Sequence, residues 1–508
     1  MFTLTSLPED ILILILEPLG IHELDALSLT CRTFNTIVNA YGWTNYLRIN
    51  PRPSYSLAKA RNVWSPRKRA RYDGLADEAW TRAEFIARPL SRAWAAKLQP
   101  VLAISPSRLL VGAGSSISSY TFGAPKPGPC APPVVFQGTV SLLEHPDRAR
   151  DITAISMVTD DDVTVIVDVA FHDGAIERVR LFPAGDPPVL SFTRTKLPPM
   201  PNADFVENIS TDANTMLTLS SNGLARLSPI ITATADTPTP PTSLIDLQTR
   251  SWTSLLSLQS TPYAAFGTAS STPLTVHALD DGGALSPAPT AILHTKRAAA
   301  DRLPSSAVYG LARAPPCSPW GASPQILVSG WYDGQVRCYD LRSSSRFSSN
   351  TPHTTNGALN GPTHTTTTPL LRPVLTLADR WSYEPIYSLS TGGGSGSHIA
   401  AGTARHSVVS FWDARSPSTG WSVHAPGNDP SPVYAVALES ARFFGVTQSR
   451  VFVYDFGPGV SLERETYPAL PLVRGVDGLK QRKGANRATY HVLRYAHDSS
   501  GLCGESLV

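Results

Sequence analysis

The chain has 508 residues, a formal net charge of +3 and 42% hydrophobic residues. Its 45 Pro and 35 Gly predict many turns and loops, which is more typical of β proteins than of helical ones. A membrane-spanning helix needs about 20 mostly apolar residues, whereas the apolar run from Ile11 to Leu16 stops after six. We therefore expect a soluble, intracellular protein. The five cysteines show no C-x-x-C spacing, which indicates isolated thiols and neither a disulfide framework nor a zinc site.

The opening segment SLPEDILILILEPLG, Ser6 to Gly20, predicts a short helix. Ser6 and Glu9 have the form of a capping box, with Pro8 in the first turn, so a helix should start near Leu7. Pro18 and Gly20 then stop it. The resulting face is too broad for so short a helix to bury alone, because two adjacent apolar stripes form on it: Leu7, Ile11, Ile15 and Leu19, and beside them Leu12 and Leu16.

Two more short helices are predicted directly after the first. Leu24 and Leu27 fit a second helix, and CRTFNTIVNAYGWTNYL, from Cys31 to Leu47, fits a third. Three short helices over about 45 residues make a poor free-standing core. We expect this region to need a partner surface.

The stretch LPEDILILILEPLGIHELDALSLTCRTFNTIV resembles an F-box, and the resemblance covers residues 4–48. It implies binding to the Skp-type adaptor, and through it to the cullin, of an SCF ubiquitin ligase. The alternative is a helical cap packed on its own chain. The residues implied to face the adaptor are Leu7, Pro8, Ile11, Leu12, Ile15 and Leu16, and those that complete the motif are Leu24, Leu27, Cys31, Arg32 and Phe34.

Residues 49–100 are predicted to be a basic connector followed by a helical spacer. Eight Lys or Arg and no acid lie between Arg48 and Arg71, so the rest of the chain is net negative. RNVWSPRKRARYDG is basic and turn-rich, and LADEAWTRAEFIARPLSRAWAAKLQ has helical spacing with a kink at Pro89. Arg67–Arg71 resembles a nuclear import signal, which leaves a cytoplasmic or nuclear location, or both, open; a solvated basic loop is the alternative. No aromatic stacking pattern supports nucleic-acid binding.

From residue 101 to 497 the sequence pattern changes and predicts short strands of alternating apolar and polar residues, separated by tight turns. Three units begin at Ile326, Ile399 and Phe443, and each ends on an aromatic–Asp pair: Tyr339-Asp340, Trp412-Asp413 and Tyr454-Asp455. Asp413 and Asp455 are 42 residues apart, close to one propeller blade of about 40–45 residues. A Ser/Thr-rich stretch at about 343–369 reads as a surface insertion. This region resembles a WD-repeat β-propeller.

Weaker copies extend the count to seven blades. They are Leu109–Phe122, Val165–Phe182, Thr215–Ser228 and Tyr263–Leu279. Six or eight blades remain alternatives. The Gly-His dipeptide of many WD repeats is absent, which leaves the individual blade boundaries open but not the general architecture. Ala488–His497 alternates like a strand that completes a blade and closes the ring, and 498–508 form a tail. The fold class is therefore a three-helix F-box, a helical spacer and an all-β WD-type propeller.

No catalytic, metal or cofactor pattern emerges: neither H-E-x-x-H, nor a phosphate loop, nor G-x-S-x-G occurs. The predicted function is a non-enzymatic substrate receptor that holds a protein substrate near activated ubiquitin. The alternative is a propeller scaffold without ubiquitin transfer. A propeller enzyme is the third possibility, with the least support.

The substrate is expected to dock on the rim formed by the turns between the middle strands of the blades. Exposed Trp, Tyr and Arg are the residue types that carry interface energy. Arg405 and Arg450 are compatible with an acidic or phosphorylated substrate. The predicted rim residues are Phe171, His172, Trp331, Tyr332, Asp333, Arg405, His406 and Arg450.

Overall fold

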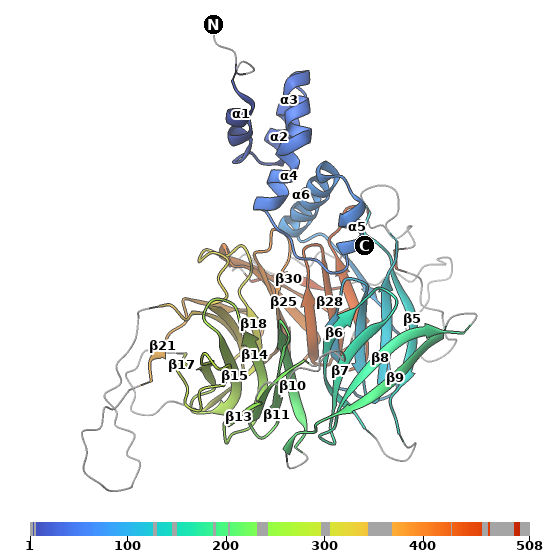
Figure 1. Ribbon diagram of the computed structural model, residues 1–508, viewed down its shortest axis with the longest axis vertical. Helices are drawn as coiled ribbons and strands as arrows, with labels where there is room; N and C mark the ends of the chain where they lie inside the picture. The colour runs from blue at the N-terminus through green and yellow to red at the C-terminus, as the bar shows by residue number, and fades with distance from the viewer. Residues whose placement is uncertain are drawn as a thin grey trace, which may run out of the picture.

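A small helical lobe stands on one end of an all-β propeller in the computed structural model (Figure 1). The structure describes residues 4, 7–124, 130–144, 150–185, 189–201, 204–230, 242–295, 305–343, 368–427, 429–459, 466–467 and 492–497. Most of the predicted Ser/Thr-rich insertion and all of the predicted tail at 498–508 lie outside these residues, as does Ser6 of the predicted capping box.

The helical lobe has its own small core. Its elements are α1 (Glu9–Leu16), α2 (Ile21–Ser28), α3 (Arg32–Ile37), the π-helical turn η2 (Val38–Gly42) and α4 (Trp43–Ile49). Helix α1 begins after Pro8 with Glu9 and Asp10 in its first turn, where acidic groups suit the helix dipole. The core residues are Leu12, Leu16, Leu24, Phe34, Ile37, Val38, Trp43 and Ala70.

The basic connector is helical, so its prediction as a turn-rich loop is wrong. It forms α5 (Ala58–Val63) and α6 (Pro66–Arg82). The Ser65 side chain accepts a hydrogen bond from the Lys68 backbone N–H, and Pro66 occupies the first turn, which together start α6. Ala83, in the left-handed conformation, ends it. Among the described residues no helix is both long and apolar enough to cross a membrane.

Four of the sheets follow the meander expected of propeller blades. The first is β2 (Val101–Ile104), β3 (Arg108–Ala113), β4 (Ser116–Phe122) and β5 (Val134–Ser141). The second is β6 (Ile152–Asp160), β7 (Val165–Phe171), β8 (Ile176–Ala184) and β9 (Val189–Leu197). The third is β10 (Val206–Asp212), β11 (Thr215–Ser220), β12 (Leu224–Pro229) and β13 (Ser243–Asp246). The fourth is β23 (Ile386–Gly392), β24 (His398–Thr403), β25 (Val408–Asp413) and β26 (Ser416–His424), with β30 (Arg494–Ala496) added outside β26.

A nine-stranded sheet lies between the third and fourth of these sheets in chain order. One unit has β14 (Ser251–Ser257), β15 (Tyr263–Ser270), β16 (Leu274–Ala278) and β17 (Ala291–Leu293), with β21 (Leu370–Leu371) outside. The other has β18 (Ser306–Arg313), β19 (Ile326–Trp331), β20 (Gln335–Asp340) and β22 (Leu375–Ala378). Two residue pairs between β15 and β18 join the units: Ala269 with Ala307, and Ser270 with Ser306.

The last sheet closes the ring, and it does so with an N-terminal strand. It contains β27 (Val433–Leu438), β28 (Arg442–Thr447), β29 (Val451–Asp455) and, outermost, β1 (Ile86–Pro89). Pro89 lies at the edge, where a missing N–H interrupts no ladder. The innermost strands touch in cyclic order, β2, β6, β10, β14, β18, β23, β27 and back to β2.

Two predictions about this region are wrong. Residues 86–89, which were expected to be helical, form β1, because pairing with β29 overrides the local helical spacing. The late strand does not close the ring: β30 pairs with β26, where Trp421 faces Ala496. In the three aromatic–Asp pairs, Asp340, Asp413 and Asp455 each accept a backbone N–H from the residue two positions on, at 2.8–3.0 Å.

Helix α6 belongs to both domains, because Ala70 lies in the core of the helical lobe and Trp80 lies in a propeller core. Trp80 stacks on Phe456 with ring centroids 3.6 Å apart, and its Nε1–H donates to the Ser440 carbonyl at 2.8 Å. Gly393, at φ 66°, lets the loop approach, since a Cβ there would lie 3.2 Å from the Trp80 ring. The glycine-rich stretch Thr391–Ser397 therefore packs against the Trp80 side chain.

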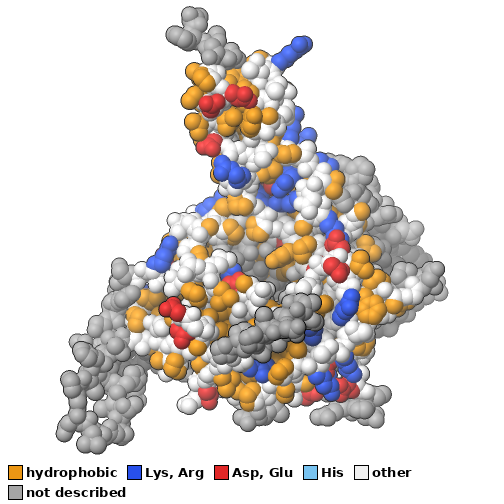
Figure 2. All heavy atoms as spheres, in the orientation of Figure 1, with side chains coloured by type: hydrophobic (Ala, Val, Ile, Leu, Met, Phe, Trp, Pro, Cys, Tyr) orange, Lys and Arg blue, Asp and Glu red, His pale blue; other side chains and the backbone are white. Residues whose placement is uncertain are grey.

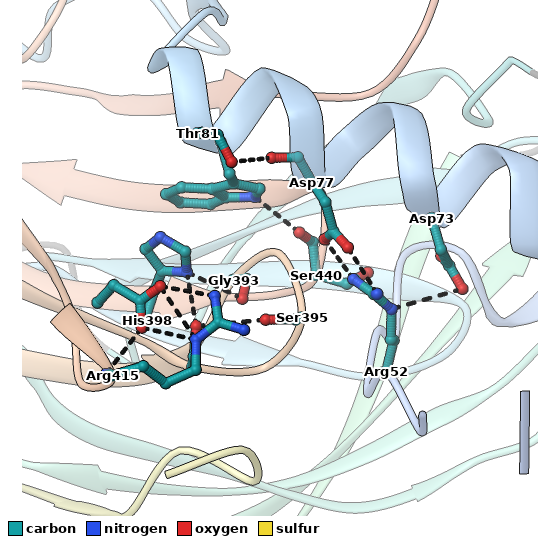
Figure 3. Close-up of polar contacts among 12 residues, drawn as sticks. Arg52, Asp73, Asp77, Thr81, Gly393, Ser395, His398, Arg415 and Ser440 are labelled. Carbon is teal, nitrogen blue, oxygen red and sulfur yellow. Dashed lines mark hydrogen bonds and ion pairs between the residues drawn. The ribbon is translucent and has the colours of Figure 1, made fainter. Parts of the chain in front are cut away.

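Buried charged residues lie between α6 and the propeller, near the Gly393 loop (Figure 3). Both Arg52 and Asp73 are almost fully buried. The Arg52 guanidinium forms two hydrogen bonds to the Asp77 carboxylate, one of them from Nη2 to Oδ2 at 2.6 Å. The Nε atom of Arg52 lies 3.8 Å from the Asp73 carboxylate. Arg61 adds a 2.6 Å pair to Asp73. The buried Glu439 carboxylate accepts the N–H groups of Tyr55 and Ser56 at 2.7 and 3.0 Å. These contacts fix the helical lobe on what we name the helix-bearing end of the propeller.

Candidate functional site

The helical lobe presents an apolar surface along α1. Leu7, Ile11 and Ile15 are 37%, 43% and 38% exposed, although all three are large aliphatic residues. Leu14 on the same helix is also exposed. Figure 2 shows apolar side chains gathered over this lobe, with acidic ones among them. We name the exposed surface of Leu7, Ile11, Leu14 and Ile15 the helical face.

The predicted motif residues divide between this face and the lobe's core. The structure buries four of them, which pack in the lobe's own core: Leu12, Leu16, Leu24 and Phe34. Pro8, Cys31 and Arg32 are exposed, and Leu27 is half-buried. The exposed subset therefore comprises Leu7, Pro8, Ile11, Ile15, Cys31 and Arg32.

A groove lies beside the helical face. Its volume is about 420 Å³, and nearly all of its lining is aliphatic or aromatic. Ile15 contributes from α1, Ala26 and Leu27 from α2, and Phe34 from α3. The face and the groove form one continuous apolar surface suited to a partner helix, the geometry in which an amphipathic helix inserts into a hydrophobic groove.

The predicted rim turns lie at the opposite end of the propeller from the helices. In an antiparallel blade, the turn from the second to the third strand is at the other end from the turn joining the first two. The helices contact first-to-second turns, at 393–397 and 439–441. The rim turns 332–334, 404–407 and 448–450 are second-to-third turns. We name this side the far end.

Two of the eight predicted rim residues are misplaced. Phe171 and Trp331 are fully buried, because each is the last residue of its strand and points into a core. Trp331 packs in an apolar cluster and donates its Nε1–H to Ser329 at 2.8 Å. The other six lie in rim turns: His172, Tyr332, Asp333, Arg405, His406 and Arg450.

Several charges of the far end are paired within the chain. Arg337 bonds the Asp333 carboxylate at 2.6 Å. His406 Nδ1 contacts Glu384, which also accepts the Arg405 backbone N–H at 2.8 Å. Arg405 is exposed. The predicted preference for an acidic or phosphorylated substrate stays a prediction.

An aromatic arc at the far end was missed by the sequence reasoning. It consists of Trp252, Tyr309, Tyr387 and Tyr434, one from each of four successive innermost strands. Ring centroids are 5.0 Å apart for Trp252 and Tyr309, 5.2 Å for Tyr309 and Tyr387, and 6.1 Å for Tyr387 and Tyr434. Tyr332, 58% exposed, adds a ring 6.3 Å from Tyr309. Each arc residue is half-buried.

The Arg250 guanidinium extends the aromatic arc beyond Trp252. Arg250 lies 4.0 Å over the Trp252 ring and 5.5 Å from the Phe205 ring. The Phe205 ring stacks in turn on His172 at 4.7 Å. Glu207 pairs with Arg250 at 2.9 Å; burial raises the pKa of this carboxyl, and Arg250 opposes the shift.

A sequence signal for the arc exists. Each arc residue lies within a bulge near the start of its strand, in the tripeptides SWT, VYG, IYS and VYA. The shared pattern is an aromatic residue with a small residue after it. It is visible only once the innermost strands are aligned with each other.

The described residues contain no group of three or more His, Cys, Asp or Glu placed to hold a metal ion. A hollow of about 620 Å³ lies between α6 and the sheet of β23–β26. Charges on its wall are paired, Arg415 with Asp413 at 2.7 Å and Arg82 with Glu78.

The helical lobe can be compared with known domains. Residues 4–48 match the F-box-like family model. This match coincides with the span expected from the sequence, and the helical lobe is an F-box-like domain. No curated protein matches the chain.

Solved structures similar to the chain include two of low sequence identity. One is Chaetomium thermophilum Sqt1 bound to the N-terminus of the ribosomal protein L10, with 13% identity, 69% of this chain and 81% of that chain covered, and a TM-score of 0.40. Another is the computationally designed Ika8 protein, with 14% identity, coverage of 72% and 99%, and a TM-score of 0.38.

Proposed function

We propose that the protein is the substrate receptor of an SCF-type ubiquitin ligase. The helical face of the F-box-like domain would bind a Skp-type adaptor, and the far end of the propeller would bind the protein substrate. The observation that carries the proposal is the exposed apolar surface of Leu7, Ile11 and Ile15 on a domain that matches the F-box-like model. Burying those side chains against a partner is favourable at about 25 cal/mol per Å² of apolar area.

We also propose that the propeller is WD-like with seven blades. Five sheets have four or five strands, and the nine-stranded sheet divides into two units at a bridge of two residue pairs. Seven innermost strands in cyclic contact support this count.

The proposed mechanism is tethering without bond chemistry in this chain. A substrate held at the far end would be presented to ubiquitin carried by the cullin assembly, which raises its effective concentration. Helix α6 supports this because it packs in the cores of both domains, so the distance between adaptor and substrate is set by a rigid element.

The alternative is a propeller scaffold that binds partners without ubiquitin transfer. The buried contacts between α6 and the propeller are compatible with it, since a cap on the chain's own fold needs the same packing. The exposed helical face favours the receptor, because a cap has no use for an apolar surface turned away from the propeller. Nuclear import through Arg67–Arg71 also stays a proposal; this segment is helical, and Arg67 pairs with Asp25 at 2.8 Å.

Capture of purified Skp adaptor and cullin by the full-length chain tests the proposal. We expect Ile11→Glu/Ile15→Glu to lower adaptor affinity by more than about tenfold, because a buried anchor is worth about 2 kcal/mol or more. Val63→Glu, at an exposed position of α5, is the matched control and should bind as wild type. Leu7→Ala/Pro8→Ala gives a second pair of truncations on the same face.

A well-folded wild type that captures no adaptor would make the helical lobe a cap and the protein a scaffold. Equal capture by wild type and by Ile11→Glu/Ile15→Glu would remove the helical face from the binding site.

A further inference from the structure

We propose that the aromatic arc of Trp252, Tyr309, Tyr387 and Tyr434 binds an arginine or lysine side chain of a protein segment at the far end of the propeller. The role of that segment as a ubiquitination substrate rests on the proposed function, but the binding itself does not. The arc is thus a recognition site for a cationic residue.

The fold places the four arc residues at one level of the ring of innermost strands. Bulges occur near the start of β14, β18, β23 and β27, at Trp252, Tyr309, Tyr387 and Tyr434. A bulge re-aims the side chain that it carries. Four bulges at equivalent positions therefore turn four rings toward the neighbouring blades, where they contact one another in series.

One cationic side chain of the protein, that of Arg250, already packs against the rings next to the arc. The Arg250 guanidinium lies between the rings of Trp252 and Phe205, at 4.0 and 5.5 Å, with Glu207 as its carboxylate. The faces of Trp and Tyr rings carry negative potential that attracts ammonium and guanidinium groups. Tyr309, Tyr387 and Tyr434 continue the same ring series beyond Arg250, and each of them is only partly buried.

Three arginines of the far end are already paired with carboxylates, which disfavours an anionic ligand at these positions. Arg150, Arg250 and Arg337 are each paired with a carboxylate at 2.9 Å or less. A phosphate would have to displace those carboxylates. Burial and the neighbouring tyrosines raise the pKa of Tyr309 and Tyr434, which keeps these two phenols neutral near neutral pH. Neutral rings keep the electron-rich faces without adding formal charge.

The same argument separates a protein segment from a nucleic acid. Single-stranded nucleic acids also stack on aromatic side chains, but they need a groove of unpaired cations along the backbone. Arg250 is the cation in contact with the arc, and Glu207 neutralises it. A peptide backbone carries no charge to be matched, so a segment with one cationic side chain fits the site better.

Binding of synthetic heptapeptide libraries by the full-length chain tests the proposal. Each immobilised library fixes one residue type at the central position and randomises the other six. We expect retention to be highest with fixed Arg or Lys, and about tenfold lower with Tyr387→Leu. Tyr387→Phe keeps the ring face and should bind as wild type. Tyr332→Leu, at an exposed ring, offers a second variant that does not threaten folding.

Adaptor capture is measured on the same samples. Adaptor capture without a preference for Arg or Lys would overturn this inference and leave the proposed function standing. Cationic preference without adaptor capture would support the site and refute the receptor role. Highest retention by fixed Asp, Glu, phosphoserine, Pro or Phe, or of single-stranded oligonucleotides assayed in parallel, would overturn the inference, as would equal loss in Tyr387→Phe and Tyr387→Leu.

Discussion

The two ends of the propeller differ in what covers them. At the helix-bearing end, Arg52 and Glu439 are almost fully buried, and their charges are met by Asp77 and by the backbone of Tyr55 and Ser56. At the far end, Tyr309, Tyr387 and Tyr434 are half-buried and touch mainly each other. One end is covered by helices that bury charged groups against it; the other carries an aromatic arc and is partly open.

This difference shows how one architecture separates permanent from exchangeable contacts. Buried charges tolerate no wrong partner, because an unpaired one costs several kcal/mol. They suit an intramolecular contact that never exchanges. Aromatic faces accept many partners at small cost, which suits a ligand that comes and goes. The following predictions test whether the two ends behave so differently.

The largest expected effect is at the helix-bearing end. Arg52→Ala removes the guanidinium that pairs with Asp73 and Asp77. Because Asp73 is buried, this substitution should lower the free energy of unfolding by about 3–5 kcal/mol. Tyr332→Ala at the far end should change it by less than about 0.5 kcal/mol, as an exposed site does. Urea unfolding followed by tryptophan fluorescence measures both. Similar losses for the two variants would abolish the contrast.

A paired tryptophan substitution sharpens the contrast. Trp80→Phe keeps the stacking on Phe456 but removes the donor to the Ser440 carbonyl, so we expect a loss of about 1–3 kcal/mol. The Trp252 Nε1–H has no hydrogen-bond partner among the described residues. Trp252→Phe should therefore cost less than Trp80→Phe in the same unfolding measurement. The reverse order would show that the ring at the far end is the better anchored one.

The smallest expected effect is a pH dependence from a histidine at the helix-bearing end. Burial lowers the pKa of His398, which stacks on Trp80, although Asp413 and the Gly393 carbonyl oppose the shift. A histidine with a lowered folded pKa contributes stability that is complete above its unfolded value of about 6.5 and is lost as pH falls below it. Unfolding between pH 7.5 and 5 should show this loss in wild type. An equal slope in His398→Gln would assign it to another group.

Local features of the fold were predictable from the sequence and non-local ones were not. Each middle hairpin, such as Ile326–Asp340, was found because two strands and their turn are contiguous in sequence. The β1 strand was missed because it is four residues long and its partner, β29, lies at the other end of the chain. Its pairing overrides the helical spacing around it.

The candidate sites divide in the same way. The F-box-like match was predictable because its motif is continuous, yet which of its leucines face outward depends on packing: Ile11 is exposed whereas Leu12 beside it is buried. Trp331 was misplaced because the rim begins one residue after the strand ends. The aromatic arc joins residues from four blades, so no local window contains it.

Closure of the ring by β1 has a consequence for the order of events during synthesis. Pro89 pairs with Phe452, roughly 360 residues later, so at about 5–20 residues per second the ribosome needs about 20–70 s to supply the partner. The F-box-like helices can fold within that interval, while β1 remains an unpaired edge. Pro89 and the charge of Arg88 make that edge a poor template for another chain. The F-box-like domain is therefore complete before the propeller ring closes.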